Sequence, residues 1–217
     1  MRLANVTCKK VEEYLTRSQT VVIPVGSIEN HGKHMPLGTD TLIPDKIVEL
    51  LEEKSGVMIA PTIPYGATNT IMGCTGTITL GTDGLVMILT KVTDSLFRYG
   101  FRKFVILNGH GGAEETAGVM GVDPSLIDYD YINEPMDLID DVAPNMKTTG
   151  WGTVDYKGAT VVFPREMHNY SGNGWYGKDE PHLATVEWGQ EMLRTFADYM
   201  ADFLTELEKL DLPKAEI

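Results

Sequence analysis

The chain has 217 residues and a formal net charge of −13 at pH 7, which argues against a nucleic-acid partner because such partners require clustered positive charge. Its N-terminal segment is charged rather than apolar, no apolar run approaches the roughly 18 residues of a membrane helix, and its two cysteines lack a C-x-x-C spacing. We therefore expect a soluble, cytoplasmic protein with reduced cysteines, no membrane partner and one domain over residues 1–217.

Short apolar segments rich in β-branched residues alternate along the chain with segments of helical periodicity. The predicted strands cover residues 20–26, 56–63, 103–109 and 159–164. The predicted helices cover about residues 9–17, 44–54, 83–99 and 186–210. This alternation is typical of parallel strands joined by helical crossovers, so the predicted class is α/β with a mostly parallel sheet.

The last predicted helix carries apolar residues at intervals of three and four, which predicts one stripe in the core or at a subunit contact. The stripe consists of Leu193, Phe196, Met200, Phe203, Leu207 and Leu210. The preceding segment, residues 133–180, is rich in Gly, Pro, Asn and Asp. It is predicted to be loop-rich and able to cover a site.

The segment "GSIENHGKHMPLGTD", residues 26–40, places metal-ligand side chains directly after the first predicted strand. Open α/β sheets bind ligands at the carboxyl ends of their strands, and in an extended chain Glu29 and His31 would point to the same side. Glycines and a proline would then turn the chain so that Asp40 returns toward them. Imidazole with carboxylate suits Zn²⁺, or Mn²⁺ or Fe²⁺, better than Ca²⁺. The alternative is a plain turn in which Asp40 caps a helix.

The segment "KFVILNGHGGAEE" predicts the second half of such a site at the end of the third predicted strand. It supplies His110 and, after flexible glycines, the acidic pair Glu114 and Glu115. Two such strand ends can enclose two metal ions about 3.5–4 Å apart, which makes hydroxide available near neutral pH. His34 is a further candidate ligand. The remaining histidines, His168 and His182, are assigned to surface or packing roles.

Three quoted blocks together resemble the signature of the creatininase (creatinine amidohydrolase) superfamily: "PVGSIENHGKHMPLGTD", "GCTGTITL…LFRYGFRKFVILNGHGG" and "GWYGKDEPHLATVEWGQEML". The resemblance covers most of the chain, in order. It implies a single-domain three-layer α/β/α sandwich, a dinuclear metal centre and a homo-oligomer, often a hexamer. It also implies that Glu29 and His110 bind one metal ion, that His31 binds the other, and that Asp40 bridges them.

Two departures from the family pattern stand out. "HGGAEETAG" looks like two family blocks fused at a single His-Gly-Gly, which indicates that a crossover unit is missing, either because the chain is shortened or because a segment is absent from this sequence. On this alignment Glu115 takes the place of the glutamate in the second block and becomes the remaining ligand of the second ion. Asn69 and Thr70 stand where relatives often carry Glu-His, so substrate specificity does not transfer.

The predicted function is a metal-dependent hydrolase that cleaves a C–N bond of a small cyclic amide or formamide with hydroxide activated by two divalent ions. Glu114, Glu115 or a loop histidine would carry the proton to the leaving nitrogen. Trp175 and Tyr176 are candidates for stacking on a ring-shaped substrate. The alternatives are a hydrolase that opens a cyclic polyol ketone, an inosose, by C–C cleavage, and a non-catalytic, metal-stabilised binding protein.

Overall fold

The parallel sheet at the centre of the molecule has the strand order β2-β1-β3. The computed structural model describes residues 1–110, 115–139, 141–175 and 180–211. Its strands are β1 (Thr20–Val25), β2 (Met58–Ile59) and β3 (Lys103–Asn108). β1 pairs with β3 along its whole length, from Thr20 opposite Lys103 to Val25 opposite Asn108. The two strands therefore end side by side at one edge of the sheet.

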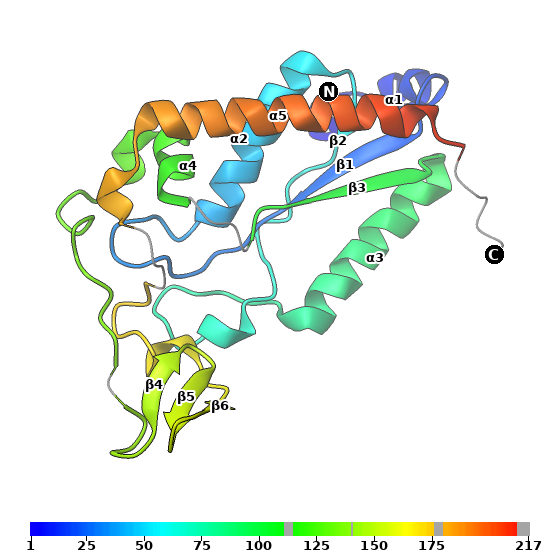
Figure 1. The fold of residues 1–217 in the computed structure, drawn as a ribbon. Coiled ribbons are helices and arrows are strands. Elements are labelled where there is room, and N and C mark those ends of the chain that lie inside the picture. The colour runs from blue at the N-terminus through cyan, green and yellow to red at the C-terminus, as the bar shows by residue number, and fades with distance from the viewer. Residues whose placement is uncertain (111–114, 140, 176–179, 212–217) are drawn as a thin grey trace.

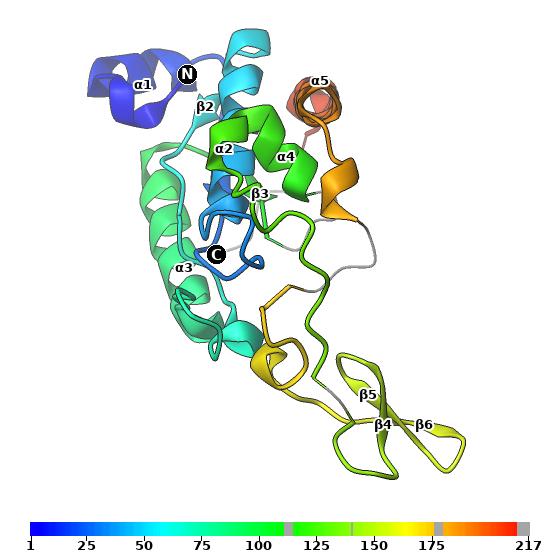
Figure 2. The same cartoon turned by 90° about the vertical axis from the view of Figure 1, so that its left-hand side faces the viewer.

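Helices cover both faces of this sheet, as Figures 1 and 2 show. One face packs against α2 (Thr39–Lys54) and α5 (Val186–Lys209), and α4 (Glu115–Val122) lies against these two helices. The other face packs against α1 (Cys8–Leu15) and α3 (Gly81–Tyr99). Because side chains alternate along a strand, Val22 enters the first core and Val21 and Ile23 enter the second. The predicted three-layer α/β/α architecture is confirmed.

A second, antiparallel sheet lies apart from the parallel one (Figure 1) and consists of β4 (Lys147–Gly150), β5 (Thr153–Tyr156) and β6 (Ala159–Val162). The prediction that residues 159–164 belong to the parallel sheet is therefore wrong. Lys157 and Gly158 have positive φ angles of 55° and 85°, which favour a tight hairpin that pairs β6 with its sequence neighbour β5. All four β6 residues are exposed, so their apolar character does not reflect burial.

Two other element boundaries differ from the prediction. The predicted strand at 56–63 contracts to β2, although Ile63 forms an isolated parallel bridge with Val25. The predicted helix at 44–54 begins earlier, at Thr39, so that Asp40 lies in its first turn and Pro44 lies inside it. Asp40 is thereby fixed on a helix rather than on a loop.

Short 3₁₀ helices complete the structure at Leu3–Asn5, Asn69–Ile71, Pro124–Leu126, Met167–Asn169 and Pro181–Leu183. In the described part of the chain, no helix combines the length and apolar character needed to cross a membrane. The single domain over residues 1–217 stays a prediction.

Candidate metal centre

The ends of β1 and β3 lie directly against the first turn of α2. Both strands are followed by glycine, at Gly26 and Gly109. A Cβ atom at Gly26 would lie 2.7 Å from the carbonyl oxygen of Asp40, and one at Gly109 would lie 2.6 Å from Cγ of Pro44. A larger residue at either position would force the strand ends away from the helix. These two glycines therefore let the residues that follow each strand reach the Asp40 carboxylate.

Asp40 is fully buried, and its two carboxylate oxygens face different histidines. Oδ1 lies 3.2 Å from Nε2 of His31, and Oδ2 lies 3.0 Å from Nδ1 of His110. The hydroxyl of Ser27 lies 2.7 Å from Oδ2 of Asp40 and 2.6 Å from Oε2 of Glu29. Ser27 thus contacts both carboxylates from the buried side and can donate its single hydroxyl hydrogen to either one, a role that the sequence analysis missed. The sequence contained one signal for this role, which is that Ser27 lies two residues before Glu29.

Five residues form what we call the carboxylate–histidine cluster: Glu29, His31, Asp40, His110 and Glu115. Nδ1 of His110 lies 3.2 Å from Oε2 of Glu29, which completes one half of the cluster with Oδ2 of Asp40. Nε2 of His31 lies 3.7 Å from Oε2 of Glu115, which completes the other half with Oδ1 of Asp40. The structure therefore brings together all five of these predicted residues.

The orientation of the His31 ring is set by the backbone. Its Nδ1 lies 3.0 Å from the carbonyl oxygen of Glu29, so the nitrogen that faces this acceptor carries the hydrogen. When the ring is neutral, Nε2, which is directed toward Asp40, therefore keeps its lone pair for a metal ion. Ligand atoms of Glu29, His31 and Asp40 all lie within 4.8 Å of one another. This spacing is compatible with a shared cation.

The buried negative charge of the carboxylates raises the pKa values of the histidines and of Glu115 in the cluster. The carboxylates of Asp40 and Glu29, which accept hydrogen bonding from Nδ1 of the His110 ring, raise the pKa of His110 to about 10. Burial lowers the pKa of His31, but the hydrogen bond and charge of Asp40 outweigh it, so that pKa is raised overall. Burial, together with the charges of Asp40 and Glu29, raises the pKa of Glu115 to about 7. Three carboxylates in a poorly solvated site thus attract cations, whether protons or metal ions.

His34 and Trp175 lie beside the cluster. The His34 ring is buried, and its Nε2 lies 3.2 Å from the hydroxyl oxygen of Thr116, the residue after Glu115. His34 therefore braces the start of α4. Trp175 meets the His34 ring edge-on, with centroids 6.3 Å apart, and lies against Gly32. Its ring is placed next to the loop that carries Glu29 and His31.

The other predicted residues fall elsewhere. Glu114 and Tyr176 lie outside the described residues. His168 and His182 are exposed and lie 3.3 Å from Glu166 and Glu180, respectively, in agreement with the surface roles assigned to them.

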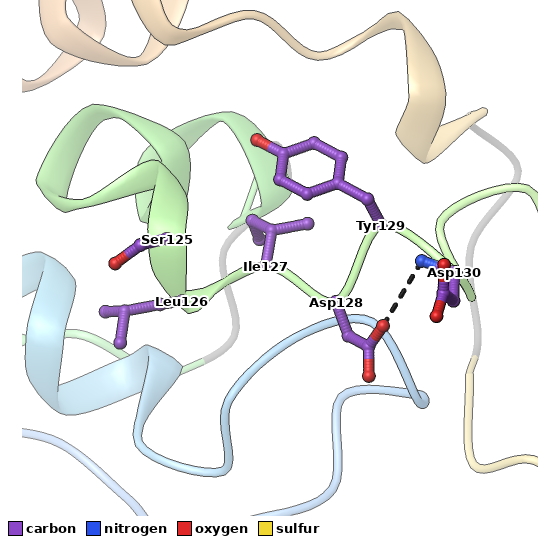
Figure 3. Close-up of a pocket in the computed structure, with 6 residues that line it drawn as sticks. All are labelled: Ser125, Leu126, Ile127, Asp128, Tyr129 and Asp130. Carbon is purple, nitrogen blue, oxygen red and sulfur yellow. Dashed lines mark hydrogen bonds between the residues drawn. The ribbon is translucent and has the colours of Figure 1, made fainter.

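A shallow pocket of about 420 Å³ lies near this region but does not include the cluster. It is lined by the consecutive residues Ser125 to Asp130, which Figure 3 shows. The backbone amide of Asp128 donates a hydrogen bond of 2.9 Å to the carbonyl oxygen of His34. This turn therefore supports the ligand-bearing loop from outside, and the candidate site is defined by side-chain geometry rather than by this pocket.

The family model for creatininase, described as creatinine amidohydrolase, matches residues 4–114 and 110–204. The chain belongs to the creatininase family. The two matches share residues 110–114, the point at which the sequence predicts a fusion of two family blocks. The resemblance stated from the motifs is confirmed.

Three curated relatives match about half of the chain or slightly less. The 3-dehydro-scyllo-inosose hydrolase of Thermotoga maritima is 36% identical over 106 residues, 48% of this chain and 34% of its own length. The mycofactocin precursor peptide peptidase of Mycolicibacterium smegmatis is 38% identical over 102 residues, 44% of this chain and 41% of its own length. The creatinine amidohydrolase of Pseudomonas putida is 30% identical over 114 residues, 50% of this chain and 44% of its own length. The matched region thus spans less than half the length of each relative.

Solved structures agree with the fold. A putative creatinine amidohydrolase from Bacteroides fragilis superposes with a TM-score of 0.72 at 23% identity, covering 99% of this chain and 98% of its own. A creatininase described as the Mn form gives a TM-score of 0.74 at 19% identity, covering 96% of this chain and 99% of its own. A mutant creatininase of Zn–Zn type gives a TM-score of 0.70 at 19% identity, covering 96% of this chain and 98% of its own. At these identities the likeness establishes the fold.

Proposed function

We propose that this chain is a metal-dependent hydrolase that holds two divalent ions, Zn²⁺ or alternatively Mn²⁺ or Fe²⁺, in the carboxylate–histidine cluster. The observation that carries the proposal is Asp40, because one of its oxygens faces His110 and the other faces His31. A carboxylate in that position can bridge two ions. The relatives named above are hydrolases, which supports the same class of reaction for this chain.

The donor set fits such ions. Glu29, His110 and Oδ2 of Asp40 would hold one ion, while His31, Glu115 and Oδ1 of Asp40 would hold the other. Imidazole nitrogen and carboxylate oxygen are the ligands that Zn²⁺ and related ions take in catalytic sites, where a position is left open. When bound, such ions lower the pKa of water and polarise a carbonyl group. Because the cluster is poorly solvated, the attraction between its carboxylates and a cation would be only weakly screened by water.

Glu115 is the proposed proton carrier. It is the first residue of α4, and its side chain is 22% exposed, against 0% for Asp40 and 7% for Glu29. It therefore lies on the accessible side of the cluster. A cation held by the cluster would lower the raised pKa that Glu115 has in the metal-free site, so the proposal rests on its position, from which its carboxylate can reach both water and a bound substrate. Glu115 is thus suited to take a proton from the attacking water and pass it to the leaving nitrogen.

The proposed substrate is a small cyclic amide or formamide, in which a C–N bond is cleaved. Trp175, which lies against the ligand-bearing loop, would form an apolar wall for a flat ring. The second candidate is the C–C cleavage of an inosose, favoured by the 36% identity to 3-dehydro-scyllo-inosose hydrolase. Both reactions use water attack on a carbonyl carbon, so the cluster alone does not separate them.

The test combines metal analysis with a substrate panel. Purified protein is loaded with Zn²⁺, Mn²⁺ or Fe²⁺, the bound ions are counted, and turnover is measured on cyclic amides, formamides and inososes. We expect two ions per chain and hydrolysis of one substrate class. Two tightly held ions with no turnover on any class would instead favour the non-catalytic, metal-stabilised protein.

Glu115→Gln tests the proton carrier against a matched control. We expect turnover to fall by about 10²–10⁴-fold, the usual contribution of general acid–base catalysis. Glu187→Gln changes an exposed glutamate in the first turn of α5 and should leave turnover unchanged. Wild-type turnover in Glu115→Gln would remove Glu115 from this role.

A further inference from the structure

His34 is a buried histidine that the proposed mechanism does not use. It is 4% exposed, and its Nε2 lies 3.2 Å from the hydroxyl oxygen of Thr116. Thr116 directs its hydroxyl hydrogen to Sδ of Met35 at 3.5 Å, so its oxygen accepts a hydrogen from Nε2 of His34. This nitrogen is engaged by a hydroxyl group and is not directed at a carboxylate of the cluster. His34, a candidate ligand from the sequence, is therefore placed to connect two segments.

The two connected segments are those that form one half of the carboxylate–histidine cluster. His31 and His34 lie three residues apart on the ligand-bearing loop, and Glu115 and Thr116 are the first two residues of α4. Nε2 of His31 lies 3.7 Å from Oε2 of Glu115. The loop and the helix therefore meet at two neighbouring contacts, one between possible metal ligands and one between His34 and Thr116. Because the segments are shared, the second contact sets the separation at the first.

The far end of α4 is held by close packing, whereas its first turn is held by these side-chain contacts. A Cβ atom at Gly121 would lie 2.5 Å from the carbonyl carbon of Gly189, so this end of α4 lies directly against α5. Among the described residues, the side chains of the first turn of α4 form hydrogen bonds only with His34 and Met35. The bond to His34 is the stronger of the two, because a thioether sulfur is a weak acceptor.

The other half of the cluster is fixed independently of His34. Nδ1 of His110 lies 3.2 Å from Oε2 of Glu29 and 3.0 Å from Oδ2 of Asp40. His110 follows β3, which pairs with β1 along its whole length, and the Glu29 carboxylate contacts the buried hydroxyl of Ser27. None of these contacts passes through α4. A disturbance at His34 should therefore reach one half of the cluster and spare the other.

We propose that His34 is a positioning residue that holds Glu115 close enough to His31 for both to bind the same ion. The inference rests on the proposed function. Nitrogen and oxygen ligands lie about 2.0–2.2 Å from Zn²⁺, so two donors of one ion can be at most ~4.2 Å apart. The observed 3.7 Å between His31 and Glu115 leaves a margin of only about 0.5 Å. A small outward shift of the first turn of α4 would therefore remove Glu115 as a ligand.

Substitutions on both sides of the hydrogen bond test this role. Thr116→Val removes the acceptor, keeps a side chain of similar shape and leaves the His34 ring against Trp175, whereas Thr116→Ser retains the hydroxyl group. His34→Leu removes the donor, and His34→Gln offers an amide N–H of similar reach. Thr93→Val is the matched control, because it removes a half-buried threonine hydroxyl that donates to the carbonyl oxygen of Leu89 in α3.

The readout is the affinity of each Zn²⁺ binding step, measured by competition with a chelator, and circular dichroism establishes folding. We expect Thr116→Val and His34→Leu to weaken one step about 10–100-fold, the usual effect of losing a group that supports a ligand, and to leave the other step unchanged. Thr116→Ser and His34→Gln should restore most of the affinity, and Thr93→Val should match wild type. Adding Thr116→Val to His31→Ala, which removes the same ion, should not change the affinity of the remaining ion.

The outcomes separate this inference from the proposed function. Two ions at wild-type affinity in Thr116→Val and His34→Leu, or equal weakening of both steps, would overturn the positioning role and leave the dinuclear site standing. A wild-type protein that binds fewer than two ions would overturn the dinuclear site and this inference together. If one of the two variants does not fold, the other decides.

Discussion

Asp40→Asn is the most direct perturbation of the proposed dinuclear site. The substitution keeps the shape of the side chain but removes its charge and replaces one carboxylate oxygen by an amide nitrogen, which cannot bind a cation. In the structure Oδ1 faces His31 at 3.2 Å and Oδ2 faces His110 at 3.0 Å. One half of the cluster therefore loses a donor atom, and both halves lose negative charge.

The size of the effect follows from this geometry. Each half of the cluster has three donor groups in the described structure, and Asp40 is the group that both share. Loss of a residue that only supports a ligand typically weakens metal binding 10–100-fold. Loss of a direct ligand should reach at least the upper end, about 100-fold or about 2.7 kcal/mol, for the ion that loses its oxygen, and the loss of negative charge should weaken binding of the other ion by less. Asp40 is fully buried, so bulk water has no direct path to replace it.

The assay measures bound metal after dialysis and affinity by competition with a chelator, for wild type and variant. Asp83→Asn is the matched control, because Asp83 is an exposed aspartate in the first turn of α3. Circular dichroism establishes that both variants are folded. A variant with two ions at wild-type affinity would refute the bridging role. One ion held at wild-type affinity would show that Asp40 serves a single ion.

Three further expectations follow from the same geometry. His31→Ala should lower the stoichiometry from two ions to one, since Glu29, His110 and Oδ2 of Asp40 remain; an unchanged count would contradict the assignment. The metal-free protein should become easier to unfold with urea as pH rises from 7 to 10. The pKa of His110 is about 10 in the folded protein against an ordinary value of 6.5. The stabilisation that protonated His110 gives to the folded state is therefore complete below pH 6.5 and is lost as pH passes 10. Gly109→Ala should cost about 1–3 kcal/mol in urea unfolding and weaken metal binding, because its Cβ would press on α2. Gly152→Ala, with no atom within 4 Å of the added Cβ, should have no comparable effect, and equal losses in both variants would contradict the packing argument.

Much of the fold was readable from the sequence because β1 and β3 are apolar runs that end in glycine and ligand-type residues. The predicted strand at 159–164 shows where prediction from local sequence fails. A short β-branched run gives the same local signal in a buried parallel strand and in an exposed hairpin, and the turn at Lys157 and Gly158 decided between them. The helix boundary at Thr39 was missed because Pro44, which lies inside α2, is usually found near the start of a helix.

The sequence by itself determined which chemical groups this protein can use: histidines and carboxylates placed just after two apolar strands. Only the tertiary structure decided how they face one another. Parallel pairing of β1 with β3 brings Glu29 and His110 together across about 80 positions of the chain, and the start of α2 inserts Asp40 between His31 and His110. Local sequence cannot specify such distances, because they depend on sheet register and on close contact between strand ends and a helix.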